Sequence, residues 1–239
     1  MMKLKKTLPL LILVLGLILF FVFGGHQYLN FQSLSDNYQK LQNFTEQHYA
    51  ISTLIFMGVY ILLVAFSIPG ATIMTLLGGF LFDVWFGTLW VVIAATIGAS
   101  ITFLAVNTAF GDALKSKVGP KLAKMQKGFT EDAFNYLLIL RLLPVFPFFI
   151  INIAAGIVGM RLRTFFIGTF IGIIPGSFIY AWVGSGLSYT LQKGDALNLG
   201  IIFEPKILFP IIGLAVLSVI PVIIKKVKAK KINSEAEEI

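Results

Sequence analysis

The stretch RLLPVFPFFIIN, residues Arg141 to Asn152, lies inside an apolar run that extends from Tyr136 to Met160. A simple membrane helix would not carry a fixed positive charge at the start of this stretch, prolines at Pro144 and Pro147, and an amide at its end. Each proline removes a backbone donor and pushes the preceding residue out of the helical region. The stretch therefore predicts two short helices joined by a bend.

The composition of the whole chain indicates that its solvent is lipid. Of the 239 residues, 57% are hydrophobic and only 13% are charged, and the mean hydropathy is +0.89, a balance that soluble domains do not reach. The absence of cysteine excludes disulfides, thiolate catalysis and cysteine metal sites. The net charge of +8 comes from lysines beside apolar segments, so we expect contact with membranes and not with nucleic acid.

The pattern of breaks in the apolar runs predicts the fold class. A second run, Ile51 to Phe82, is interrupted at Ser67 to Gly70 and again at Gly78 and Gly79, which predicts another bent hairpin. We expect an all-α integral membrane protein with about four transmembrane helices and two oppositely inserted re-entrant hairpins, which form an inverted repeat. The predicted spans are Leu8 to Phe23, Trp85 to Val106, Thr164 to Leu187 and Ile207 to Ile224.

A faint internal repeat accompanies this layout, because three positions of the first half recur at a constant offset in the second. They are Pro69, Gly78 and Gly98, which correspond to Pro147, Gly156 and Gly176. In the span from Thr164, glycine also repeats every fourth residue, at Gly168, Gly172 and Gly176, and we interpret this face as one that packs closely against another helix.

The positions of the lysines predict the orientation. Lysines cluster near the N-terminus, within residues 107–135 and within residues 225–231, whereas residues 24–50 contain only Lys40. By the positive-inside rule, both termini and the central loop are cytoplasmic. The expected organisation is an N-terminal transmembrane helix with an external polar segment in residues 1–50, a core in residues 51–187, and a C-terminal transmembrane helix with a basic tail in residues 188–239.

Arg141 is the first candidate for a functional residue. A guanidinium in apolar sequence is costly unless it pairs, faces water or reaches the membrane surface. It either marks the cytoplasmic lip of the hairpin or holds a phosphate or another anion. Pro144 and Pro147 would set the bend and aim helix ends at the same anion, and Asn152 would either cap the turn or contact the ligand.

The other hairpin offers hydroxyl groups around an opened turn and no charge. Pro69, Gly70 and Thr72 are candidates for lining a substrate, with Ser67 and Thr75 beside them; the alternative is that the hydroxyls bond their own backbone. Asp83 follows this hairpin, and we interpret it as interfacial or capping, with a proton relay as the alternative. The predicted substrate-binding residues are thus Arg141, Pro144, Pro147, Asn152, Pro69, Gly70 and Thr72.

Four motifs give the region from Ile51 to Leu187 a family resemblance. They are SIPGATIMTLLGGFLF (Ser67–Phe82), GASITFL (Gly98–Leu104), RLLPVFPFFIINIAAG (Arg141–Gly156) and FFIGTFIGIIPGSFIYAWVGSG (Phe165–Gly186). The chain resembles the DedA-like, VTT-domain family, also called the SNARE-associated Golgi protein family, and within it the Tvp-type branch. The resemblance implies two re-entrant hairpins from opposite faces and a link to lipid movement between leaflets, with Arg141 as the family's hairpin arginine and Pro69 with Gly70 as its first turn.

The sequence departs from DedA proper at two places. Pro147 stands where the second arginine of DedA would fall, and Ala71 and Thr72 stand where glutamates are expected near Pro69. These differences argue against proton-coupled export and favour the Tvp-type branch.

Three functions remain open at this stage. The first is movement of lipids or lipid-linked anions between leaflets, as in a scramblase or flippase; the second is transport of a small anion or osmolyte; the third is a non-transporting scaffold for membrane assembly or trafficking. We expect no enzymatic activity and no cofactor, since no catalytic constellation is present. Membrane lipids with anionic headgroups are the expected partners, and a homo-oligomer is left open. The expected location is the bacterial cytoplasmic membrane, or the Golgi or endoplasmic reticulum in a eukaryote.

Overall fold

The computed structural model describes residues 2–24, 37–110, 133–142, 146–192 and the helical residues 205, 208, 209, 212 and 213. The described part is built of helices and contains no strand. Pro144, the central lysine cluster and nearly all of the predicted fourth span and basic tail lie outside the described residues. The helices are α1 (Met2–Val22), α3 (Tyr38–Gln47), α4 (Tyr49–Ala65), α5 (Ala71–Phe110), α7 (Ala133–Leu142), α8 (Phe148–Val158) and α9 (Leu162–Gln192).

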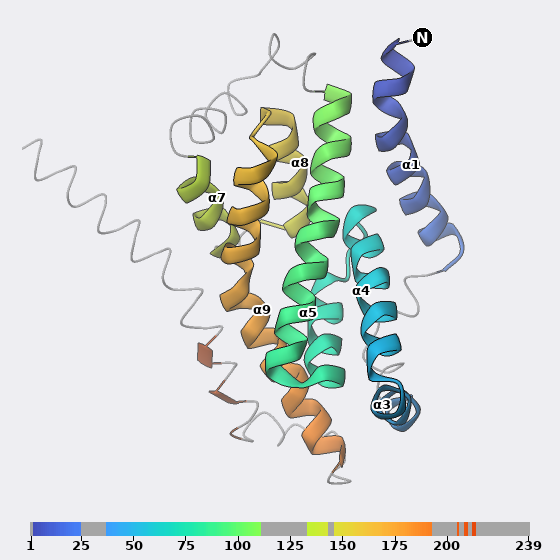
Figure 1. Ribbon diagram of the computed structural model, residues 1–239, viewed down its shortest axis with the longest axis vertical. Helices are drawn as coiled ribbons and strands as arrows, with labels where there is room; N and C mark the ends of the chain where they lie inside the picture. The colour runs from blue at the N-terminus through green and yellow to red at the C-terminus, as the bar shows by residue number, and fades with distance from the viewer. Residues whose placement is uncertain are drawn as a thin grey trace, which may run out of the picture.

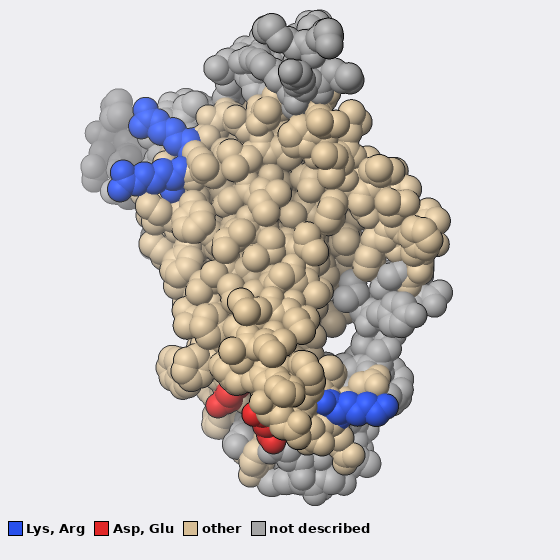
Figure 2. All heavy atoms as spheres, turned by 45° about the vertical axis from the view of Figure 1, so that its right-hand side comes forward, with Lys and Arg blue, Asp and Glu red and all other residues tan. Residues whose placement is uncertain are grey.

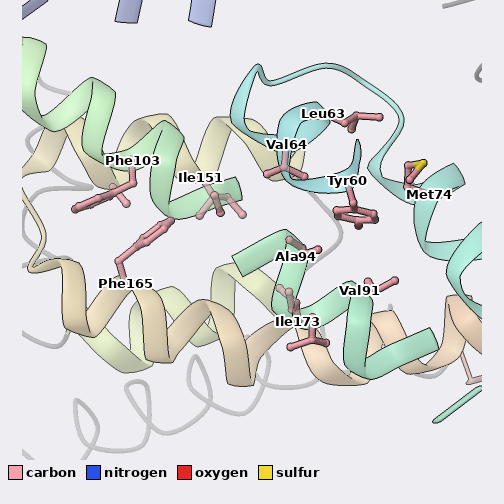
Figure 3. Packing of buried hydrophobic residues seen from close by; sticks show 14 of the residues in the cluster. Tyr60, Leu63, Val64, Met74, Val91, Ala94, Phe103, Ile151, Phe165 and Ile173 are labelled. Carbon is pink, nitrogen blue, oxygen red and sulfur yellow. The ribbon is translucent and has the colours of Figure 1, made fainter. Parts of the chain in front are cut away.

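The long helices α5 and α9 form the centre of the molecule, and the shorter helices pack around them (Figure 1). Long runs of Leu, Ile and Val satisfy their backbone hydrogen bonds within each helix, as a hydrocarbon environment requires. The core holds the stacked rings of Phe103 and Phe165, whose centroids are 4.5 Å apart, and it continues through Val91, Ala94 and Ile173 (Figure 3).

α5 is a bent helix and not one straight rod of 40 residues. Asp83 breaks it with φ 63° and ψ 178°, and the chain turns so sharply that a Cβ on Gly87 would lie 2.5 Å from the carbonyl oxygen of Gly78. In a straight helix these two residues would be roughly 13 Å apart. α5 therefore consists of a short segment, residues 71–82, and a long segment, residues 84–110.

The predicted break at Gly78 and Gly79 was thus in the wrong place. Both glycines are helical, and the chain bends at Asp83 instead. The glycines serve close packing: a Cβ on Gly79 would collide with the backbone of Ala181 in α9, and one on Gly78 would lie 2.7 Å from a methyl group of Val91. Two neighbouring glycines were interpreted as a helix break because glycine favours both breaks and close contacts.

The same sequence of elements occurs twice. α4, a turn at residues 66–70 and the short segment of α5 lead into the long segment of α5; α7, a connection and α8 lead into α9. The breaks before the two long helices are both left-handed, at Asp83 with φ 63° and at Gly159 with φ 73°. The two long helices run in opposite directions in Figure 1, with the long segment of α5 rising and α9 descending. The described helices thus have the order and directions of an inverted repeat.

Among the described residues, two helices, α5 and α9, are long and apolar enough to cross a membrane, and α3 with α4 forms a third candidate that is bent by 118°. The predicted segment Leu8 to Phe23 lies in and just after α1, a shorter apolar helix. The protein is therefore an all-helical membrane protein, while the full layout of four spans with two re-entrant hairpins, and the division into three regions, stay predictions.

Candidate functional site

The turn between α4 and the short segment of α5 lies beside the start of α8. The two helix pairs of the repeat, the first hairpin (α4 and the short segment of α5) and the second (α7 and α8), thus meet at their tips. A cavity of about 200 Å³ lies between the turn of the first hairpin and the start of α8, and it is lined by Ser67 to Thr72 and by Pro147 to Phe149, together with Val64. Pro147 is the residue before the first turn of α8, with φ −53° and ψ 137°. The predicted residues Pro69, Gly70, Thr72 and Pro147 are therefore brought together, although they come from separate halves of the chain.

The turn of the first hairpin is held open by the backbone and by one buried threonine. Ser67 and Gly70 adopt positive φ values of 57° and 146°, which removes two residues from any helix. Thr102, on the long segment of α5, lies within 3.1 Å of the Val64 carbonyl and 3.0 Å of the Ala65 carbonyl. The Val64 carbonyl also accepts from the Ser67 amide, so the Thr102 hydroxyl adds a donor at the end of α4, where carbonyl groups lose their intrahelical partners.

A larger cavity of about 420 Å³ lies next to these tips and contains Arg141. Residues of both hairpins and of both long helices line it, so the site exists only in the assembled fold. Its polar lining consists of Tyr60, Thr72, Thr75, Arg141, Ser177 and Tyr180, and its apolar lining includes Ala95, Phe146, Pro147, Phe148, Ile151 and Ile173.

Neutral partners hold the Arg141 side chain in place. Nη2 donates to Asn152 Oδ1 at 2.7 Å and to Thr169 Oγ1 at 2.9 Å, and Nη1 lies 3.5 Å from the Phe148 carbonyl oxygen. The guanidinium carbon also lies 4.3 Å from the centroid of the Phe148 ring, in the range of a cation–π contact. The arginine is thus fixed in a defined orientation.

The charge of Arg141 is left without a counter-charge. Within the part of the chain that the structure describes, no carboxylate forms an ion pair with it, and its Nε is buried without a hydrogen-bond partner. A guanidinium in this setting attracts an anion and offers it directional donors.

Asn152 lies against Arg141 and outside both cavities. Its side chain is fully buried, with 0% exposure, and it does not line either cavity. It accepts a hydrogen bond from Arg141, so it helps to position the guanidinium, and its contact with a ligand stays a prediction. Its own Nδ2 has no partner among the described residues.

The glycine face of α9 combines packing with an opening. A Cβ on Gly168 would lie 2.9 Å from Leu137 Cδ2, and a Cβ on Gly172 would lie 2.8 Å from Arg141 Cβ, whereas nothing lies within 4 Å of such an atom on Gly176. The packing prediction is confirmed for the first two glycines, which let α7 approach. It was wrong for Gly176, which lines the cavity.

Sequence reasoning missed Tyr60, Thr169, Ser177 and Tyr180. The Tyr60 hydroxyl lies 2.9 Å from Thr75 Oγ1 and 3.1 Å from the Ala71 carbonyl, and Thr75 also donates to that carbonyl at 2.8 Å. The Thr75 hydroxyl therefore bonds its own backbone, as the structural alternative expected. Among these four residues, only Thr169 had a local sequence signal. It lies three residues before Gly172 and so shares the helix face for which the sequence predicted close packing.

Comparison with known proteins gives one family. The chain matches the VTT domain over residues 68–186. A transmembrane protein 41 homolog of Dictyostelium discoideum is 31% identical over 221 residues, which is 83% of this chain and 64% of the relative. The Caenorhabditis elegans homolog is 31% identical over 78% of this chain and 74% of the relative, and human transmembrane protein 41B is 30% identical over 80% and 65%.

The match spans a little under two thirds of the length of the Dictyostelium and human relatives. No solved structure matches the chain with significance. Membership in the Tvp-type branch stays a prediction, because the relatives named here are transmembrane protein 41 proteins.

Proposed function

Since the chain belongs to the VTT-domain family of membrane proteins, we propose that it moves lipids with anionic headgroups between the two leaflets, with Arg141 as the headgroup ligand. One observation carries this proposal. The Arg141 guanidinium, held by neutral partners, lines a cavity of about 420 Å³ beside the point where both hairpin tips meet.

The physical obstacle to lipid exchange is the headgroup, because a bare charge at the bilayer centre costs about 3 kcal/mol or more. A fixed cation with free donors lowers that cost for a phosphate at the depth where water is scarce. Hydroxyl groups from Tyr60, Thr72 and Ser177 share the cavity with Arg141, and they supply further hydrogen-bond partners for phosphate oxygens.

Apolar side chains beside the cavity favour a lipid over a small solute. Phe146 lines the cavity and is 48% exposed, and Phe149 and Ile150 on the same helix tip are exposed as well. Such a rim suits acyl chains that stay in the bilayer while the headgroup enters. A closed passage lined by water would suit a small anion or osmolyte better.

The proposal includes an orientation. α1 begins at the end of the molecule where the long segment of α5 ends and α9 begins (Figure 1). Arg161 and Arg163 lie at this end, at the start of α9, and the positive-inside rule makes it cytoplasmic. On the face in Figure 2 the acidic side chains lie at the opposite end. The membrane would be the bacterial cytoplasmic membrane, or that of the Golgi or endoplasmic reticulum in a eukaryote. No bond is made or broken in this function, so the protein would be neither an enzyme nor dependent on a cofactor.

The test is leaflet exchange of a fluorescent phosphatidylglycerol in liposomes that contain the purified protein. Arg141→Ala removes the ligand, and Arg161→Ala is the matched control, since it removes an exposed positive charge outside the cavity. We expect fast exchange for wild type and for Arg161→Ala, and loss of exchange for Arg141→Ala that elutes as a folded protein.

The same vesicles separate the competing functions. Release of trapped phosphate or sulfate without lipid exchange would support a small-anion transporter. If wild-type protein moves neither lipid nor solute, the proposed transport is wrong and a scaffold is the better explanation.

A further inference from the structure

A second cavity, of about 580 Å³, lies at the far end of the first hairpin from the tips. It is bounded by α3, by the bend of α5 at Asp83 and by the C-terminal part of α9. Its character is opposite to that of the Arg141 cavity, because its charged lining residues are Glu46 and Asp83 and it contains no arginine or lysine.

The two carboxylates keep oxygen atoms for a ligand. Asp83 Oδ1 accepts from the Val84 amide at 2.7 Å and from the Ser185 hydroxyl at 2.6 Å, so the side chain is fixed while its second oxygen bonds no described residue. Glu46 Oε1 accepts from Gln42 Nε2 at 3.1 Å. Neither carboxylate forms an ion pair within the described ranges, so the cavity has a net negative charge.

Aromatic rings form another wall of the same cavity. The centroid of the Tyr49 ring lies 5.6 Å from that of Phe82 and 6.5 Å from that of Phe86, both edge to face, and all three residues line the cavity. Carboxylates together with aromatic rings are the combination that binds organic ammonium groups, through charge attraction and cation–π contacts.

A buried polar atom in the lining points independently to a ligand. The Oε1 of Gln42, a lining residue, is buried without a hydrogen-bond partner among the described residues. A buried acceptor without a partner is costly, and a ligand with N–H donors would satisfy it.

The aromatic residues around this cavity indicate its depth in the membrane. All three tryptophans of the chain lie on the helix segments that adjoin the cavity: Trp85 and Trp90 follow the Asp83 bend, and Trp182 precedes Ser185. Trp85 is 75% exposed, and Phe178 lies between it and Trp182, with centroid distances of 5.3 and 5.9 Å. Exposed tryptophans gather at the level of the lipid headgroups, so the cavity opens where headgroups lie.

We propose that this cavity binds the ammonium group of a zwitterionic phospholipid headgroup, ethanolamine or choline, with Asp83 and Glu46 as counter-charges and Tyr49, Phe82 and Phe86 as the aromatic wall. The proposal rests on the proposed function in taking a phospholipid as the occupant. A metal ion is a poorer fit, since no group of three or more His, Cys, Asp or Glu side chains lies together in the described residues.

The tryptophans at this end provide the assay. The full-length protein is reconstituted in mixed phosphatidylethanolamine and phosphatidylglycerol vesicles in which one lipid at a time carries brominated acyl chains, and quenching of tryptophan fluorescence reports which lipid is enriched nearby. Wild type should favour phosphatidylethanolamine, and the Asp83→Asn, Glu46→Gln double variant should lose roughly fivefold or more in relative binding constant, the range of an exposed cation–π and charge contact.

Asparagine has the size of aspartate and keeps the oxygen that accepts from the Val84 amide and the Ser185 hydroxyl, so the double variant should fold. Arg161→Ala is the control and should leave the preference unchanged, because it removes an exposed charge that lines neither cavity. Tyr49→Leu should weaken phosphatidylcholine more than phosphatidylethanolamine, because a quaternary ammonium depends more on the aromatic wall.

Two results would overturn the inference: an unchanged lipid preference in the double variant, or soluble phosphoethanolamine that displaces the lipid at concentrations near those of the lipid itself. Leaflet exchange measured on the same vesicles keeps the two proposals apart. A lipid preference that depends on Asp83 and Glu46, without any leaflet exchange, would support the inference and refute the transport function. Leaflet exchange without that preference would support the transport function and refute the inference.

Discussion

Gly172 provides a sharp test of whether the position of Arg141 matters for transport. A Cβ at Gly172 would lie 2.8 Å from Arg141 Cβ and 3.1 Å from its Cγ, whereas carbon atoms in contact prefer about 3.5 to 4 Å. Gly172→Ala therefore requires the stem of Arg141 to shift by roughly 0.7 Å or more. The neighbouring atoms are close to the backbone of α7, so rotation of a flexible side-chain end cannot relieve the contact.

Such a shift disturbs the hydrogen bonds that orient the guanidinium. The contacts to Asn152 and Thr169 are now 2.7 and 2.9 Å long, and stretching them by the same amount brings them to the limit of hydrogen bonding. Overpacking of this kind costs about 1 to 3 kcal/mol, partly offset by the roughly 1 kcal/mol that alanine contributes in a helix relative to glycine. We expect a folded protein with a melting temperature near that of wild type but with exchange of phosphatidylglycerol reduced about tenfold.

The same helix supplies two controls, one turn to either side. Gly168→Ala meets the end of the Leu137 side chain, which can rotate away, and Gly176→Ala meets nothing within 4 Å, so both should retain most of the exchange. The assay is fluorescence loss on addition of a membrane-impermeant quencher, with thermal unfolding in detergent measured in parallel. If Gly172→Ala is folded and exchanges lipid at the wild-type rate, the positioning of Arg141 by α9 is irrelevant and the reasoning fails.

Three further substitutions test other contacts. Asn152→Asp would place a carboxylate beside Arg141 and cancel its positive charge, so exchange of anionic lipid should fall strongly. The variant should still elute as a folded protein. Retained exchange would show that the net charge of the cavity does not matter. Thr102→Val leaves the Val64 and Ala65 carbonyls without a side-chain donor and should lower the free energy of unfolding by about 1 to 3 kcal/mol, measured by thermal unfolding. The control is Thr108→Val, which removes an exposed hydroxyl that bonds only its own helix. Equal losses of stability in the two variants would refute a special role for Thr102. Asp83→Ala loses the bonds to Val84 and Ser185 and leaves a non-glycine residue at φ 63°, so it should lower the free energy of unfolding by about 1 to 3 kcal/mol. Asp83→Gly relieves the backbone strain and should lower it less. The opposite order would contradict this explanation of the bend.

The features that the sequence predicted correctly act over short distances along the chain. Proline disfavours helix at its own position and at the residue before it, so the turn at Ser67 to Gly70 and the non-helical Pro147 followed from local rules. The rule is not absolute, because Pro9 and Pro175 lie inside α1 and α9. An arginine within apolar residues needs partners in any membrane fold, which is why Arg141 was the first candidate. The candidates Thr72 and Pro147 lie beside it because each adjoins a predicted break.

The features that were missed depend on contacts between distant residues. Thr169 reaches Arg141 from 28 positions away and Thr102 reaches Val64 from 38, and no local pattern specifies such a pair. The bend at Asp83 was hidden for a related reason: glycine pairs can either break a helix or let two helices approach, and only the partner helix decides between these roles. For Asn152 a cap of the turn and a ligand contact were both left open, and its hydrogen bond with Arg141 depends on how α7 and α8 pack.

The lengths of the short helices explain why a polar site can form deep in this fold. The short segment of α5 contains residues 71–82 and α8 contains residues 148–158, so each advances roughly 17 Å from its break to its tip. That distance is close to half of a hydrocarbon core about 30 Å thick. If the Asp83 bend lies at one headgroup level, as the tryptophans indicate, and the Gly159 bend lies at the other, then the two tips meet near the midplane. In that arrangement the Arg141 cavity would lie at the depth where a headgroup meets its highest barrier, and under the proposed function the cavity at Asp83 would lie where a headgroup begins its path. A zwitterionic lipid carries one charge suited to each place, an ammonium for Asp83 and Glu46 and a phosphate for Arg141.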